Sequence, residues 1–182
     1  RIVYYKTEEF SSSWSSLNST YRHKFKSPAK KFEDKSLSII LTVDQSGSQS
    51  DEALGKMLHV INKKADQIAD LTILIHDTEI RATGKFSGSS LKDNPEVFKL
   101  MSNRICSGGT SHYHTTKYIV DAIKSGAINP EQTIYMSYSD NISDIPQVLA
   151  KFPEMKQIET IWVSDIYNPL PASCGGTNIT LI

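Results

Sequence analysis

The sequence lacks the features that mark several common classes of protein. No apolar run among its 182 residues approaches a membrane span, and no signal peptide is recognisable. Lys plus Arg and Asp plus Glu number 20 each, so the net charge is zero. That balance argues against a general binder of nucleic acids or anionic membranes. The chain also has no internal repeat and no His-Glu-x-x-His motif, which excludes that type of zinc peptidase.

Cysteine is scarce as well. The two cysteines, Cys106 and Cys174, lack metal-ligand spacing. Both lie near glycine pairs, and a disulfide between them is one alternative. Two free thiols in a cytoplasmic protein are the simpler interpretation. Because the chain begins at Arg1 rather than Met, we expect a piece of a longer protein or a processed form. Its composition, 38% hydrophobic and 22% charged, is ordinary for a globular domain with a sizeable core.

One stretch has the most informative local pattern. An apolar run rich in isoleucine and valine covers residues 37–43 and ends at Asp44, and hydroxyls follow at Ser46 and Ser48 on either side of Gly47. A helical pattern begins soon afterwards, so the stretch predicts a buried strand, a loop and a helix start. Ligands collect at the carboxyl ends of strands in open α/β sheets. The aspartate and the two serines are therefore candidate site residues, and capping of the helix by Ser48 is compatible with that role.

The rest of the chain alternates apolar runs with amphipathic segments. Further core strands are predicted at residues 71–76, 133–138 and 158–164, and edge strands at 78–83 and 178–182. Helices are predicted over residues 51–69, 115–125 and 145–152, with shorter helical turns at 95–101 and a loop at 84–95. The alternation predicts an α/β fold with a Rossmann-like, doubly wound, mostly parallel sheet and helices on both faces.

The first 35 residues differ from the remainder. Serine is dense over residues 11–19, and Lys and Arg are dense over residues 22–35. A loose spacing of aromatic and aliphatic residues accompanies them. We expect an N-terminal extension, residues 1–35, that packs on or links to a domain formed by residues 36–182.

In the predicted fold, three loops at strand ends become neighbours. They carry these oxygen donors: Asp44, Ser46, Ser48, Thr110 and Asp140. Hard oxygen ligands suit Mg²⁺, Mn²⁺ or Ca²⁺ rather than Zn²⁺ or Cu⁺. Capping and turn chemistry can explain any one of these residues, but their convergence from three loops favours a metal site.

This arrangement resembles the von Willebrand factor A (VWA) domain with its metal-ion-dependent adhesion site, the MIDAS. The family's Asp-x-Ser-x-Ser motif is matched by Asp44, Ser46 and Ser48, its later threonine by Thr110, and its last aspartate by Asp140. The resemblance implies a protein-binding module rather than an enzyme. In such a module the five residues hold Mg²⁺ or Mn²⁺, and an acidic side chain of a partner protein completes the coordination of the metal.

The chain resembles more specifically the bacterial and phage VWA-like proteins classed as metallopeptidases. Similar features are Trp14 and a basic stretch near Arg22 ahead of the first strand, Trp162 in a late strand, and a Pro- and Gly-containing tail over residues 169–176. Longer members of that group carry a metallopeptidase-like region, which is missing here. The resemblance implies an AAA+ ATPase of the MoxR type as a candidate partner.

One short segment, residues 139–141, departs from that family. Asn141 follows Asp140 where the family usually has glycine in a Thr-Asp-Gly sequence, and Ser139 stands in place of the threonine. The aspartate is retained, so the ligand set stays intact, but the loop after it is expected to differ.

Three alternative assignments stand beside the metal-dependent binding module. A zinc site from His76, His112 and His114 is conceivable, but histidines two apart at a helix start are commonly surface or capping residues, which is the preferred interpretation. The second alternative is a metal-dependent hydrolase. Two observations argue against it: a phosphatase of the dehalogenase type needs aspartate where Ser46 stands, and the sequence shows no nucleophile–base pair. The third is a structural assembly component with a vestigial metal site.

Overall fold

The computed structural model describes residues 37–46, 55–57, 59, 61, 65, 68–106, 108–141 and 143–181. All of them lie in the compact unit Lys35–Ile182. The prediction for the N-terminal extension and the proposed ligand Ser48 concern residues outside this set. Within it, no helix combines the length and the apolar character needed to cross a bilayer.

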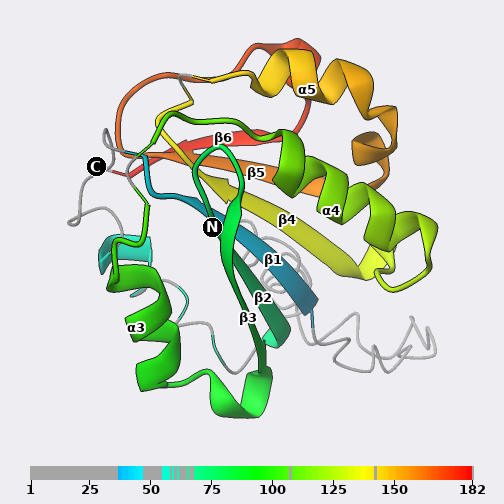
Figure 1. Ribbon diagram of the computed structural model, residues 1–182. Helices are drawn as coiled ribbons and strands as arrows, with labels where there is room; N and C mark the ends of the chain where they lie inside the picture. Colours follow the sequence, from blue (N-terminus) through cyan, green and yellow to red (C-terminus); the bar gives the residue numbers. More distant parts are fainter. Residues whose placement is uncertain are drawn as a thin grey trace, which may run out of the picture. The chain divides into compact units, whose positions relative to one another are not determined.

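A six-stranded sheet organises the unit, with strand order β3-β2-β1-β4-β5-β6. The strands are β1 (Leu37–Asp44), β2 (Ile68–His76), β3 (Ile80–Ser87), β4 (Thr133–Tyr138), β5 (Glu159–Ser164) and β6 (Thr177–Thr180). Strand β3 runs antiparallel to β2, and all other neighbours are parallel. Figure 1 shows the twisted sheet, with β1 and β4 in its middle. The carboxyl ends of β1, β4 and β5 therefore meet at one edge.

The helices are α3 (Pro95–Ser102), α4 (Tyr113–Lys124) and α5 (Ile145–Lys151). Short 3₁₀ helices are η3 (Gly88–Ser90), η4 (Pro130–Gln132), η5 (Pro153–Gln157) and η6 (Ala172–Cys174). Helix α3 begins where the sequence predicts a start, because the side chain of Asn94 accepts a hydrogen bond from the backbone N–H of Glu96 and Pro95 occupies the first turn. Between β1 and β2, the described residues 55–57, 59 and 61 are helical.

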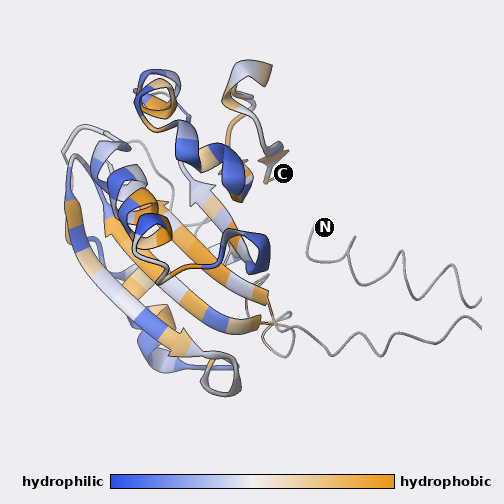
Figure 2. Ribbon diagram, turned by 90° about the vertical axis from the view of Figure 1, so that its right-hand side faces the viewer, coloured by the Kyte–Doolittle hydropathy of each residue, from blue (hydrophilic) through white to orange (hydrophobic). Residues whose placement is uncertain are grey.

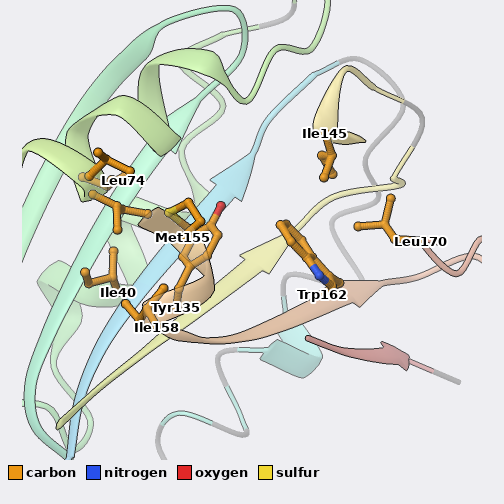
Figure 3. Packing of buried hydrophobic residues seen from close by; sticks show 10 residues of the cluster. Ile40, Leu74, Tyr135, Ile145, Met155, Ile158, Trp162 and Leu170 are labelled. Carbon is orange, nitrogen blue, oxygen red and sulfur yellow. The ribbon is translucent and has the colours of Figure 1, made fainter. Parts of the chain in front are cut away.

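Helices cover both faces of the sheet. Ile40, Leu74, Tyr135 and Trp162 pack against α4, α5 and η5 in one hydrophobic cluster, and Figure 3 shows their side chains gathered there. On the opposite face, α3 packs on β3 so closely that a Cβ atom at Gly84 would lie 2.5 Å from the side chain of Leu100. Figure 2 shows hydrophobic colour concentrated on the inner strands of the sheet. The predicted doubly wound α/β fold is confirmed.

Some element boundaries differ from the predictions. Ile68, assigned to the end of a helix, begins β2 and sits opposite Leu37 of β1. Residues 84–87, predicted as loop, continue β3 as far as Ser87, which pairs with Asp70. Helix α4 starts at Tyr113 rather than at residue 115. In each case hydrogen bonding to a neighbouring strand or loop extends an element beyond its local sequence signal.

Candidate functional site

Three loops converge on one buried carboxylate, that of Asp44 at the end of β1. Its Oδ1 accepts a hydrogen bond from the backbone N–H of Ser46 at 2.8 Å. Its Oδ2 accepts hydrogen bonds from the hydroxyls of Thr110 and Ser139, each at 3.2 Å. Asp44 is 0% exposed. The carboxylate therefore ties together the loop after β1, the loop before α4 and the loop after β4.

The predicted ligands are distributed around this carboxylate. Ser46 is buried directly beside it, and Thr110 contacts it through its hydroxyl. Asp140 is buried and follows Ser139, which itself bonds to the carboxylate. The structure thus brings Asp44, Ser46 and Thr110 together and places Asp140 one residue from a member of the cluster.

Ser139 is a member of the cluster that the sequence reasoning did not single out. It ends the segment that leaves β4, and its hydroxyl both donates to Asp44 and accepts from the backbone N–H of Asn141 at 3.2 Å. Its position beside Asp140, where the resembling family has threonine, was the available signal, because either residue supplies a hydroxyl.

The loop after β4 is held by a pair of asparagines. Asn168 donates to the backbone carbonyl of Asp140 at 3.0 Å, and Asn141 donates to the carbonyl of Asn168 at 2.9 Å. Asn141 has a φ of 60°, a left-handed conformation that glycine adopts freely and asparagine tolerates better than most residues. Asparagine in place of the family's glycine is therefore compatible with this turn, and its side chain adds a hydrogen bond to the loop after β5.

Gln45 positions the segment that leads to Thr110. The side chain is buried, and its Nε2 donates to the carbonyls of Met101 and Asn103 at 3.1 and 3.0 Å. Its Oε1 accepts from the backbone N–H of Ile105 at 3.1 Å and from the thiol of Cys106 at 3.7 Å. Burial raises the pKa of that thiol, so it remains protonated and able to donate. The side-chain amide of Gln45 therefore connects the end of β1 to the end of α3 and the segment that follows it.

Asp144 anchors the same loop from its other side. Its carboxylate accepts from the hydroxyl of Ser111 at 2.7 Å and from the backbone N–H of His112 at 2.9 Å. The side chain is 36% exposed and lies at the amino end of α4, where the helix dipole favours a negative charge. Sequence reasoning missed this aspartate because the contact joins residues more than thirty positions apart.

Two histidines are buried next to the cluster. The rings of His76 and His112 lie edge to face with centroids 5.0 Å apart. The Nδ1 of His76 lies 3.2 Å from the carbonyl of Asp77, and the Nδ1 of His112 lies 3.1 Å from the hydroxyl of Ser143. Neither Nε2 has a hydrogen-bond partner among the described residues. Burial lowers the pKa of both imidazoles, so both are neutral at pH 7.

The preferred interpretation of the histidines was wrong for His112. It is a core residue, 1% exposed, and its side chain makes no capping bond although it stands at the start of α4. His114 is exposed and its ring packs against Tyr113 instead of joining the pair. Among the residues that the structure describes, no three His, Cys, Asp or Glu side chains gather as a metal site. The zinc alternative that needed all three histidines therefore lacks its third ligand.

The two thiols are free, as the sequence predicted, and both are partly buried.

Comparison with known proteins bears on the fold. No protein-family model matches the chain, and no curated protein matches it. The crystal structure of an aerotolerance-related membrane protein from Bacteroides fragilis, with multiple mutations to serine, aligns with 80% of this chain and 92% of its own at a TM-score of 0.52 and 10% identity. The conserved hypothetical protein BatB from Bacteroides thetaiotaomicron aligns with 70% of this chain and 66% of its own, at a TM-score of 0.47 and 13% identity.

The fold is VWA-like. At 10% identity the likeness concerns the arrangement of strands and helices alone. The VWA-like fold accounts for the position of the cluster, because the carboxyl ends of β1 and β4 adjoin in the middle of the sheet.

The chemistry of the cluster fits a hard cation. Asp44 is fully buried, and among the described residues no Lys or Arg forms an ion pair with it. Its hydrogen-bond donors are the hydroxyls of Thr110 and Ser139 and the backbone N–H of Ser46. The hydroxyls add oxygen atoms to the cluster, and none of the three donors carries a positive charge. A buried carboxylate is ordinarily paired with a cation. Oxygen donors of this kind suit Mg²⁺ or Mn²⁺.

Proposed function

We propose that this VWA-like domain is a metal-dependent protein-binding module. Asp44, Ser46, Ser48, Thr110 and Asp140 would hold one Mg²⁺ or Mn²⁺ at the carboxyl edge of the sheet. An Asp or Glu side chain of a partner protein would complete the coordination of the metal. Bound there, the cation would supply Lewis-acid attraction for that carboxylate, and the protein residues would fix its position.

The observation that carries this proposal is the convergence of three loops on the Asp44 carboxylate. Two of the predicted ligands, Ser46 and Thr110, meet Asp44 although Thr110 is 66 positions away in the chain. Three of the five proposed ligands are neutral hydroxyls, which donate less electron density to the cation than carboxylates do. The cation would therefore stay electrophilic, and an acidic side chain of a partner could occupy a remaining coordination position.

As partner we propose an AAA+ ATPase of the MoxR type. This part of the proposal rests on the resemblance of Asp44, Ser46, Ser48, Thr110 and Asp140 to the MIDAS motif. It is tested by co-expressing the full chain with such an ATPase from the same source and measuring co-purification with Mg²⁺ and with EDTA. Co-purification that needs the metal supports the pairing, and equal recovery in both conditions contradicts a metal-mediated contact.

The metal site is tested by calorimetry and thermal unfolding with added Mg²⁺ or Mn²⁺. A ligand at about one hundred times its Kd stabilises the folded state by roughly 2.7 kcal/mol. For a domain of this size that corresponds to a rise in Tm of about 5–10 °C. Asp44→Asn removes the charge at nearly constant shape, and Thr110→Val removes one hydroxyl, so both should reduce the metal-induced rise.

The matched control is Asp70→Asn, because Asp70 is an exposed carboxylate of β2 at the other end of the sheet. This variant should keep the full metal response. Equal metal-induced shifts in wild type, Asp44→Asn and Thr110→Val would rule out the site. Partner binding that persists in Asp44→Asn despite a lost metal response would favour a structural component with a vestigial site.

A further inference from the structure

Four large apolar side chains of the described residues are exposed, and three of them lie near the candidate site. The four are Phe98 at 61%, Ile105 at 51%, Ile166 at 43% and Tyr167 at 86% exposed. Phe98 belongs to α3, whereas the other three lie in loops at the carboxyl edge of the sheet. Single exposed apolar residues are common on protein surfaces, so their arrangement matters more than their presence.

Ile105 is held on one side of the oxygen cluster. Its backbone N–H donates to the side chain of Gln45, the residue that follows Asp44. The same side chain binds the carbonyls of Met101 and Asn103, so the end of α3 and Ile105 are fixed as one piece beside β1. Hydrogen bonds from the neighbour of a proposed ligand therefore fix the backbone that presents the exposed side chain of Ile105.

Ile166 and Tyr167 are held on the other side. The backbone N–H of Ile166 donates to the hydroxyl of Ser164 at 3.2 Å, and the N–H of Asn168 donates to the carbonyl of Ile166 at 2.9 Å. This turn places Tyr167 at its tip. Asn168 also donates to the carbonyl of Asp140, which ties the turn to the loop that carries the last proposed ligand.

The order of the strands in the sheet determines the order in which these residues follow one another along its carboxyl edge. Ile105 adjoins the end of β1, Asp44 ends β1, Asp140 follows β4, and Tyr167 follows β5. Neighbouring strands lie about 4.8 Å apart, so β1 and β5 are separated by roughly 10 Å. An extended peptide covers that distance with about three residues. The edge thus presents an apolar side chain, the proposed binding position for an acidic group, and a second apolar side chain. Their spacing matches that of neighbouring residues in a short extended peptide.

We propose that this edge binds a partner segment in which an Asp or Glu is flanked on both sides by large apolar residues. The inference rests on the proposed function, since the central position is the metal-bound carboxylate. Ile105 would contact the apolar residue on one side, and Ile166 with Tyr167 would contact the residue on the other. Tyrosine suits this role because it buries a large area with little loss of side-chain freedom and is enriched at interfaces.

The test uses an array of synthetic nonapeptides and the full chain. One set has Asp or Glu between Leu or Phe residues placed one or two positions away, a second set has Ser in those flanking positions, and a third keeps the apolar flanks but replaces the acid by Asn. Fluorescence anisotropy is measured with Mg²⁺ and with EDTA. The best apolar-flanked acidic peptide should bind about tenfold more tightly than its Ser-flanked counterpart.

Variants locate the effect on the protein. Tyr167→Ser and Ile105→Ser should each reduce binding of the apolar-flanked peptides several-fold, toward the level of the Ser-flanked set. Phe98→Ser is the matched control, since it removes from α3 an apolar side chain whose exposure lies between those of Ile105 and Tyr167, and it should leave binding unchanged. All three positions are exposed, so the variants should fold, which thermal unfolding checks.

The outcomes separate this inference from the proposed function. Equal, metal-dependent binding of apolar-flanked and Ser-flanked acidic peptides overturns the inference and leaves the metal-dependent module intact. Binding that survives both EDTA and the change from acid to Asn, or no binding of any acidic peptide, overturns the proposed function and this inference with it. A wild-type dimer that dissociates in Tyr167→Ser would show instead that the edge binds a second copy of the chain, which also overturns the proposal.

Discussion

Strand β1 joins two regions that are equally buried and chemically opposite. Ile40, in its middle, belongs to the hydrophobic cluster with Leu74 and Tyr135, whereas Asp44, at its end, is surrounded by hydroxyls and backbone groups. Burial of apolar surface stabilises the first region directly. In the second, burial costs free energy unless each polar group is bonded. A fold that keeps such a cluster at the carboxyl ends of its strands therefore points to a function there.

The hydrophobic cluster should show the largest effect on stability. Trp162 is 2% exposed, stacks edge to face on Tyr135, and donates from its indole N–H to the carbonyl of Gly175. Trp162→Ala should lower the free energy of unfolding by about 3–5 kcal/mol, measured in urea. The loss should be the same with and without Mg²⁺. A loss that Mg²⁺ fully reverses would mean that the two regions are not separable.

The loop after β4 should show a smaller effect. Asn141→Ala removes the bond to Asn168 and places a residue with a Cβ at a φ of 60°. We expect a loss of about 1–2 kcal/mol in the free energy of unfolding. Asn141→Gly keeps the backbone conformation without strain and should lose less. If alanine and glycine destabilise equally, the positive φ contributes nothing and the side-chain bond carries the whole effect.

The buried histidines should make stability depend on pH. Their folded-state pKa lies below the unfolded value of about 6.5 because burial disfavours the charged ring. The unfolded chain then binds more protons, so the free energy of unfolding falls as the pH drops below about 6.5 and is unaffected by these groups above about 7.5. His112→Gln should flatten this decline, measured by urea unfolding between pH 5 and 8. The exposed His114→Gln is the control, and an unchanged slope in His112→Gln would contradict the assignment.

The smallest expected signal is enzymatic activity, which we predict to be absent. The oxygen atoms of the Asp44 carboxylate already accept three hydrogen bonds from protein groups, and the sequence offers no nucleophile–base pair beside it. We expect no peptidase or phosphatase turnover above background with Mg²⁺ or Mn²⁺ present. Turnover that disappears in Asp44→Asn would replace the binding module by the hydrolase alternative.

Much of the fold could be predicted from the sequence, for a simple reason. Apolar runs such as residues 37–43 and 133–138 are long enough to be buried strands, and the amphipathic pattern of α4 leaves one face to cover them. Asp44 could be chosen as a site residue because it ends an apolar run, and Thr110 because it follows a glycine pair and matches the MIDAS motif; both have oxygen donors. Their joint binding of a metal stays a prediction.

The tertiary structure decided what local pattern does not encode. Strand pairing drew Ile68 into β2 and extended β3 to Ser87, since hydrogen bonds to a neighbouring strand outweigh a weak local preference. The contacts of Ser139 and Asp144 join segments that are distant in the chain, and burial of His112 depends on what packs around it. Spacing along a sequence determines which elements form. Only their packing determines which side chains meet, because those contacts arise from distances in space rather than along the chain.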